Sequence, residues 1–273
     1  MNHPARSYLF VPGNRPERFD KAIASAADVV VIDLEDAVDP ETKADSRGHV
    51  ASWTSGRDAR TLARVALRIN DAGSEYFGED LRLVRDCAIR RIMLPKAEHA
   101  DQVARVLDAQ ADALVLPLLE TARGLDACGG IAAARGVQRM VFGTLDFAFD
   151  LELDLGEDLQ PLAEAAAQIV RASRVAGLQA PVAGVTPQLR DEARLSTDWS
   201  WFRRRGFGAK LCIHPCQVGP VHEGLAPDAE AVDWARRVVA VDARGAGAAS
   251  VDGRMVDRPV VLQALRILRR AGL

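Results

Sequence analysis

The sequence predicts a (β/α)₈ barrel followed by a C-terminal helical extension. Short apolar runs alternate with stretches of helical spacing, which is typical of a parallel sheet. Eight such units fit within about 210 residues, the size of one barrel. A doubly wound open sheet is the alternative. It usually carries a glycine-rich turn after its first strand, whereas "VPGNRPER" contains a single glycine here.

The eight expected strands are apolar runs bounded by polar or turn residues. They are residues 8–12, 29–35, 65–70, 91–96, 114–120, 139–147, 180–185 and 210–215. The second, "VVVIDLE", opens with four β-branched residues and predicts a strand buried on both faces.

Helical patterns fill the intervals between the strands. Residues 15–26 predict a helix after the first strand, with Asn14 as its cap and Glu17 three residues on. Residues 99–110 carry an apolar stripe at helical spacing, and a longer alanine-rich helix is expected to end at Gly177.

The domain boundary is expected near residue 220, because no linker-like stretch precedes it. Residues 1–220 would form the catalytic barrel, and residues 221–273 an extension that packs on it. Within the extension, the small-residue-rich segment 245–260 predicts a loop or arm outside the barrel.

The composition excludes several kinds of partner. The chain has 273 residues, 48% of them apolar, and a formal charge of -3, which argues against nucleic acid or an acidic membrane surface. No apolar run approaches the roughly 20 residues of a membrane span, and the N-terminus lacks a signal-peptide core. Four cysteines in this length do not make a disulfide framework, so a reduced, cytoplasmic protein is expected.

A metal site at "LCIHPC" is disfavoured. Cys212, His214 and Cys216 lie close together, but their spacing is not a zinc pattern and no second Cys/His pair follows. We interpret them as small apolar strand residues beside a buried histidine.

Polar residues gather at the ends of the expected strands, where a barrel places its active site. These residues are Glu35, Asp36, Arg68, Asn70, Lys96, Glu120, Arg123, Asp146 and His214. Acidic groups are costly inside a core, so their position at the strand ends indicates a pocket where they meet a metal, an arginine or water.

Glu120 and Asp146 end consecutive expected strands. Two carboxylates with waters and substrate oxygens suit Mg²⁺, which seldom uses an all-protein cage. The alternative is that each caps the following helix or pairs with Arg123.

Arg68, within an apolar strand, needs an anionic partner. That partner is either a substrate group, namely a carboxylate or a developing enolate, or the carboxylate of Glu35 or Asp36 in a structural ion pair. The substrate contact and the ion pair can coexist.

Together these stretches resemble the citrate lyase β-subunit branch of the HpcH/HpaI aldolases. The matching pieces run in family order: "LFVPGNRPERFDKA", "VVVIDLEDAV", "ALRIN", "IMLPKAE", "LLETARGL", "FGTLDFAFDL", "KLCIHPCQV" and "DGRMVDRPV". The resemblance implies a barrel enzyme that makes or cleaves a carbon–carbon bond in acyl thioesters, yielding an acetyl thioester and a keto acid. It also implies assembly as a homotrimer.

The resemblance further implies roles for individual residues. Glu120 and Asp146 match the family's Mg²⁺ ligands, and Arg68 matches the residue that holds the thioester or enolate oxygen. Asp257 matches an aspartate that reaches a neighbouring subunit's site and transfers the proton. We also expect Glu35 and Asp36 to belong to the catalytic residues, together with Arg68.

The coenzyme A of such a substrate requires a phosphate-binding surface. Arg15, Arg18 and Lys21 follow the first strand and are assigned to it, with a solvated helix face as the alternative. Lys96 is a second phosphate contact or a partner of Glu98.

One departure from the family concerns Leu145, where many members carry glutamate before the metal aspartate. Because side chains alternate along a strand, Leu145 is expected to point away from the metal. The acyl group, whether malyl, citramalyl or citryl, is not fixed by the sequence. The alternatives are an aldolase acting on free hydroxy keto acids and a non-catalytic or partner-dependent subunit.

Overall fold

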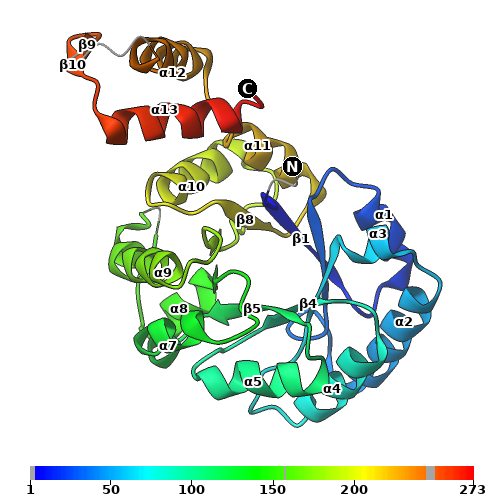
Figure 1. The fold of residues 1–273 in the computed structure, drawn as a ribbon. Helices are drawn as coiled ribbons and strands as arrows, with labels where there is room; N and C mark the ends of the chain where they lie inside the picture. The colour runs from blue at the N-terminus through cyan, green and yellow to red at the C-terminus, as the bar shows by residue number, and fades with distance from the viewer. Residues whose placement is uncertain (1–3, 157, 244–249) are drawn as a thin grey trace. The chain divides into compact units, whose positions relative to one another are not determined.

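Eight parallel strands close into a barrel in the computed structural model of the chain (Figure 1). The structure describes residues 4–156, 158–243 and 250–273. Each strand pairs with the next in sequence, and the first pairs with the last. The strands are β1 (Ser7–Pro12), β2 (Val29–Asp33), β3 (Val65–Arg68), β4 (Arg91–Leu94), β5 (Leu114–Leu119), β6 (Val141–Phe142), β7 (Val182–Ala183) and β8 (Ala209–Cys212). The predicted (β/α)₈ barrel is therefore confirmed.

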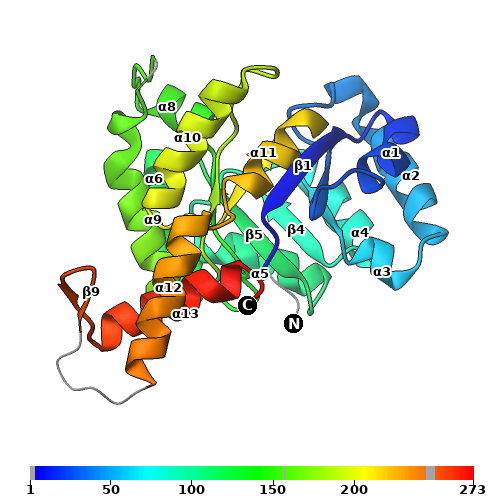
Figure 2. The ribbon, with the colours of Figure 1, turned by 90° about the horizontal axis from the view of Figure 1, so that it is seen from above.

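Helices surround the strands, as Figures 1 and 2 show. They are α1 (Phe19–Ile23), α2 (Lys43–Ser55), α3 (Ala59–Leu62), α4 (Phe77–Asp86), α5 (Ala100–Ala109), α6 (Ala122–Asp126), α7 (Cys128–Ala133), α8 (Thr144–Asp150), α9 (Ala163–Val175), α10 (Glu192–Arg204) and α11 (Val218–Glu223). Short 3₁₀ turns also occur: η1 (Pro16–Arg18), η2 (Pro40–Thr42), η3 (Gln160–Leu162) and η4 (Pro215–Gln217).

The barrel interior is a packed apolar core, because alternate residues of every strand point inward. Its buried members are Tyr8, Val29, Val31, Ala66, Met93, Leu116, Leu118, Val141, Val182, Ala209 and Leu211. The intervening strand residues face the helices, so β2 is buried on both faces as its β-branched run predicts.

Two local expectations about the elements are wrong. Asn14 caps no helix, because Pro16 starts the η1 turn and Glu17 instead pairs with Arg15. The expected strand over residues 139–147 is two residues long, because the chain turns into α8 at Thr144. By contrast, Gly177 does follow the end of α9, with a φ of 71° that favours glycine.

The chain divides into two compact units, Met1–Val221 and His222–Leu273. The second contains α12 (Ala229–Asp242), the antiparallel pair β9 (Ser250–Val251) and β10 (Arg254–Met255), and α13 (Arg258–Arg270). Its small core includes Ala235, Val238, Val261 and Ala264. Of the expected loop 245–260, residues 245–249 lie outside the described part, and the remainder forms the hairpin and the start of α13. None of the described helices has the length and apolar character of a membrane span.

Candidate active site

Charged side chains continue the inward-facing rows of three strands beyond the apolar core. Asp33, Arg68 and Glu120 each stand two residues after an interior residue of β2, β3 or β5. Strand alternation therefore places all three on the inner face at the carboxyl end of the barrel. The register of β2 and β3 also sets Asp33 directly beside Arg68.

Arg68 is buried among carboxylates. Its Nε and Nη2 donate to the two oxygens of Asp33 at 2.7 and 2.6 Å, and Nη1 lies 2.7 Å from Glu35 and 3.2 Å from Asp36. The guanidinium carbon lies 4.9 Å from the centre of the Phe10 ring. Burial alone would lower the pKa of Arg68, but attraction to the three carboxylates outweighs it and raises the pKa. The expected ion pair is confirmed, with Asp33 as a further partner.

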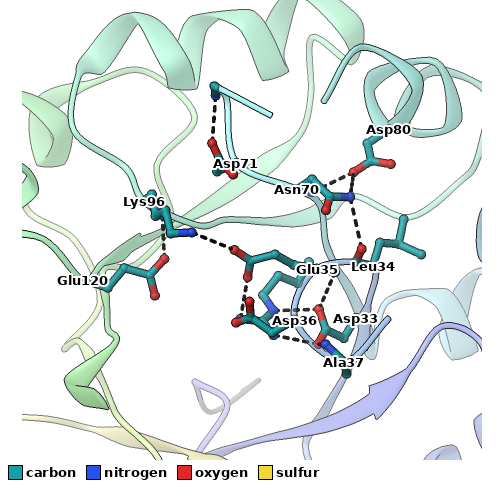
Figure 3. A network of polar contacts seen from close by, with 12 residues as sticks. Asp33, Leu34, Glu35, Asp36, Ala37, Asn70, Asp71, Asp80, Lys96 and Glu120 are labelled. Atoms are coloured by element: carbon teal, nitrogen blue, oxygen red, sulfur yellow. Dashed lines mark hydrogen bonds and ion pairs between the residues drawn. The ribbon is translucent and has the colours of Figure 1, made fainter. Parts of the chain in front are cut away.

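Glu35 is also buried, and Figure 3 shows its carboxylate facing Lys96. Its Oε2 touches Arg68 without hydrogen-bonding geometry, and its Oε1 lies 3.9 Å from the ammonium of Lys96. Burial raises the pKa of Glu35 to about 8, and repulsion from Asp36 and other carboxylates adds to the effect while Arg68 opposes it. This raised pKa favours the protonated form of Glu35 near neutral pH.

Glu120 is held by the backbone on either side of β5. Its Oε1 accepts a hydrogen bond of 2.8 Å from the amide of Lys96, whose φ of 45° lies in the left-handed region (Figure 3). A Cβ at Gly143 would stand 2.6 Å from Glu120 Oε2, so only glycine leaves room for the carboxylate. Burial raises the pKa of Glu120 to about 7, and repulsion from Asp146 contributes.

Asp146 lies in the first turn of α8 and not at the end of a strand. The expectation that strand alternation turns Leu145 away from the site is therefore wrong. In this helical turn Leu145 and Asp146 both line the pocket that also contains Glu120.

A pocket of about 320 Å³ opens at this end of the barrel. Its lining consists of Phe10, Asp33, Asp36, Ala37, Arg68, Leu118, Glu120, Gly143, Thr144, Leu145, Asp146, Val185, Leu211 and Ile213. The structure thus brings together four predicted site residues: Asp36, Arg68, Glu120 and Asp146. Sequence reasoning missed Asp33 as a site residue, although it is the first acid of "VVVIDLED".

A buried polar network supports the end of β2. The Lys43 ammonium donates to the carbonyls of Leu34 and Glu35 and to Asn70 Oδ1 at 2.7–3.0 Å. The amide of Asn70 donates in turn to Asp80 at 2.7 Å (Figure 3). Asn70 therefore fixes the loop after β3, and it does not line the pocket.

The predicted phosphate-binding residues Arg15, Arg18 and Lys21 are exposed on the segment that follows β1. Arg15 forms an ion pair of 2.8 Å with Glu17.

Of the two alternatives for Lys96, the pairing with Glu98 is wrong, whereas the phosphate contact stays a prediction. Its ammonium approaches Glu35, while Glu98 accepts a hydrogen bond from Thr121. Thr121 also caps α6, so Glu120 has no capping role.

The "LCIHPC" residues lie at the end of β8 and in the turn that follows it. Among the described residues, no group of three or more His, Cys, Asp or Glu side chains is placed to hold a metal. Cys212 is buried as expected, but His214 is only half-buried and Cys216 is exposed, with its Sγ 2.9 Å from His214 Nδ1. The expectations that His214 is buried and that Cys216 is an apolar strand residue are therefore wrong.

Asp257 lies in the second unit, where its side chain caps α13 by accepting a hydrogen bond from the amide of Val260. Its position relative to the pocket stays a prediction.

The donor set of the pocket fits a magnesium ion. Four carboxylates line the pocket against a single arginine, which leaves an excess of negative charge. Glu120 and Asp146 supply oxygen ligands, and Mg²⁺ typically binds one or two carboxylates together with water and substrate oxygens.

A closed parallel barrel with charged groups at the carboxyl ends of its strands defines an enzyme of the (β/α)₈ class. The family model "HpcH/HpaI aldolase/citrate lyase" matches residues 6–215. The chain belongs to this family and is a carbon–carbon lyase of the citrate lyase β-like type.

Two groups of curated relatives cover nearly the whole chain. A citrate lyase subunit beta-like protein of Mycobacterium tuberculosis is 36% identical over 97% of this chain and 95% of its own length. A (3S)-malyl-CoA thioesterase of Cereibacter sphaeroides is 30% identical over 98% of this chain and 95% of its own length.

Solved structures from M. tuberculosis share the fold. CitE in complex with magnesium, acetoacetate and coenzyme A superposes with a TM-score of 0.89 at 34% identity, covering 100% of both chains. The citrate lyase beta subunit complexed with oxaloacetate and magnesium gives a TM-score of 0.72 at 32% identity, covering 82% of this chain and 98% of the other.

Proposed function

We propose that the protein is a magnesium-dependent lyase that cleaves a 3-hydroxyacyl-CoA into acetyl-CoA and a keto acid. The observation that carries the proposal is the convergence of Glu120, Asp146 and Arg68 on one pocket. The magnesium and coenzyme A bound to the M. tuberculosis CitE relative support it.

Glu120 and Asp146 would hold the magnesium ion. When bound, it supplies positive charge that favours loss of the substrate's hydroxyl proton. The Lys96 amide and the space left by Gly143 fix the Glu120 carboxylate for this role. Such supporting groups orient metal ligands and tune their affinity.

Arg68 is proposed to hold the acetyl thioester enolate that is left when the carbon–carbon bond breaks. A guanidinium already fixed by Asp33 needs little reorganisation to stabilise developing negative charge. Glu35 and Asp36 act as positioning residues for Arg68. The ring of Phe10 covers the guanidinium and limits the access of water.

Asp257 is proposed to transfer the proton at the enolate carbon from a neighbouring subunit of a homotrimer. Arg15, Arg18 and Lys21 are proposed to bind the phosphates of coenzyme A, with Lys96 as a further candidate. Their support is the position of the loop after β1, at the same end of the barrel as the pocket. A cytoplasmic location is proposed because the four cysteines are free thiols.

The test incubates the purified protein with malyl-, citramalyl- and citryl-CoA, with and without Mg²⁺, and measures acetyl-CoA and keto-acid release. Magnesium-dependent cleavage of at least one ester is expected, and Glu120→Gln should abolish it. Cleavage of free hydroxy keto acids but of no ester would contradict the proposal and favour an aldolase. Inactivity toward both classes of substrate would favour a partner-dependent subunit.

A further inference from the structure

One buried cation takes no part in the proposed reaction. Lys210 lies in β8 between Ala209 and Leu211, which point into the barrel, so its own side chain points outward to the helices. It is fully buried, and its ammonium lies 5.7 Å from the centre of the Phe202 ring on α10. Because an ammonium is costly to bury without polar partners, its contacts indicate its role.

The partner of this ammonium is the end of β7. Lys210 Nζ donates a hydrogen bond of 2.7 Å to the carbonyl of Gly184, the residue that follows Val182–Ala183. Burial lowers the pKa of Lys210 to about 8, and attraction to Asp198 on α10 opposes this shift. The side chain therefore stays charged at neutral pH, and a charged donor makes a stronger hydrogen bond than a neutral one.

Asp198 fixes the same segment from the side of α10. Its Oδ2 accepts a hydrogen bond of 2.7 Å from Thr186 Oγ1, and its Oδ1 accepts one of 2.8 Å from Arg194. The carbonyl of Thr186 accepts a further bond of 2.9 Å from the buried side chain of Gln217. Since β7 has only two residues, polar groups of β8, η4 and α10 hold the segment 184–186 in place.

Gly184 in turn packs against the turn that carries Asp146. A Cβ at Gly184 would stand 2.3 Å from Thr144 Oγ1, so the two segments are in direct contact and only glycine fits there. Thr144 is the first residue of α8, and Asp146 lies in the same helical turn. Gly143 packs closely against Glu120 of the neighbouring strand. The turn therefore lies between the ends of β5 and β7, and a shift of the β7 end would move Asp146.

We infer that Lys210 is a positioning residue for Asp146. From outside the pocket, its ammonium holds the carbonyl of Gly184, and Gly184 keeps the first turn of α8 where the Asp146 carboxylate lines the pocket with Glu120. Groups that do not touch a metal commonly set its affinity by orienting its ligands. The inference rests on the proposed function, in which both carboxylates bind magnesium.

Lys210→Met tests the inference, because methionine carries neither a charge nor a donor. Calorimetric titration with Mg²⁺ should show an affinity about tenfold lower than that of the wild type. The control is Arg139→Met, which removes another buried cation. Arg139 donates to the carbonyls of Ala5 and Ala180, which precede β1 and β7 at the opposite end of the barrel. Arg139→Met should therefore lower the melting temperature and keep the wild-type magnesium affinity.

Gly184→Ala tests the same contact without a change of charge, and it decides the question if Lys210→Met does not fold. The added Cβ would displace Thr144, so magnesium affinity should again fall about tenfold or more. The control is Gly208→Ala, whose Cβ would stand 2.9 Å from Ala180 Cβ at the opposite end of the barrel. It should lower stability without weakening magnesium binding.

The outcomes separate this inference from the proposed function. A folded Lys210→Met protein that binds magnesium like the wild type, or an equal loss of affinity in Arg139→Met, would overturn the inference alone. Where Lys210→Met does not fold, wild-type affinity in Gly184→Ala would overturn it. A wild type that binds magnesium but cleaves no ester would contradict the proposed reaction, while the affinities of the variants still decide the role of Lys210. A wild type that binds no magnesium would overturn both.

Discussion

Arg68 meets more carboxylates than one guanidinium can neutralise. Asp33 occupies two of its donors, and Asp36 and Glu35 share a third. Glu35 is more buried than Asp36, with 7% of its surface exposed, and its Oε2 has no hydrogen bond. A neutral Glu35 therefore lowers the repulsion within the cluster.

Replacement of Glu35 by glutamine should remove a pH dependence of the free energy of unfolding that the wild type has. The pKa of Glu35 rises from 4.5 to about 8 on folding, so its stabilising contribution is present below the ordinary pKa and is lost as the pH rises through about 8. Glu35→Gln stays neutral at every pH. Its free energy of unfolding relative to the wild type should therefore rise by on the order of a few kcal/mol between pH 5 and 8.5. Chemical denaturation at both pH values measures the difference.

The matched control is Glu164→Gln, which changes an exposed glutamate on α9. Its stability relative to the wild type should be nearly the same at both pH values. A difference between Glu35→Gln and the wild type that does not grow with pH would show that Glu35 is ionised in the fold.

The sequence predicts that acidic residues contact Arg68, but it does not predict which of them forms its main hydrogen bonds. "VVVIDLED" offers three acids within four residues, namely Asp33, Glu35 and Asp36. The choice depends on the register between β2 and β3, which sets Asp33 opposite Arg68. Register in a barrel follows from closure of the whole sheet, so no local pattern contains it.

At the scale of elements, the junction of β6 and α8 shows how a local pattern was misread. The apolar run "RMVFGTLDF" predicts one long strand, but only Val141–Phe142 pair with neighbouring strands. The buried residues that follow, Thr144, Phe147 and Ala148, are spaced three and four apart, which is the helical signal. The eight units, by contrast, were predictable because each alternates strand and helix patterns over many residues.

Gly143→Ala tests whether this junction positions Glu120. The added Cβ would lie 2.6 Å from Glu120 Oε2 and 2.7 Å from Glu120 Cβ, so the carboxylate must move. Magnesium affinity and turnover should each fall about 10–100-fold, the usual effect of disturbing a ligand's support. Calorimetry and the ester cleavage assay measure the two quantities.

Gly129→Ala on α7 is the control, because its Cβ would meet no atom within 4 Å. This variant should retain magnesium binding and activity, with stability unchanged or raised by about 0.5–1 kcal/mol. The proposed role of Gly143 would be disproved by an alanine variant that binds magnesium and turns over like the wild type.

At the scale of the whole molecule, Asp257 belongs to a unit of its own, outside the barrel unit that holds the pocket. If it serves the site of a neighbouring subunit, two different defects should complement each other. Glu120→Gln and Asp257→Asn should each be inactive alone. Coexpressed in equal amounts, they should recover up to about a third of the wild-type rate in mixed trimers, because one site in three is then intact.

Complementation requires chains that assemble together, so the mixed oligomer is isolated with two affinity tags before assay. Separately purified variants that are combined without exchange of subunits serve as the control and should stay inactive. A mixed oligomer without activity would place Asp257 in the site of its own chain or remove it from the reaction.

The pairing of β1 with β8 has a consequence for how the protein responds to ligands. Phe10 and Ile213 line one pocket, yet they belong to the first and last segments of the barrel. All parts of the pocket are therefore in place only when the ring of strands is closed. A ligand that binds there binds only the folded barrel. It therefore stabilises the barrel as one unit against unfolding. Retention of a bound ligand thus reports that the last strand has reached its place.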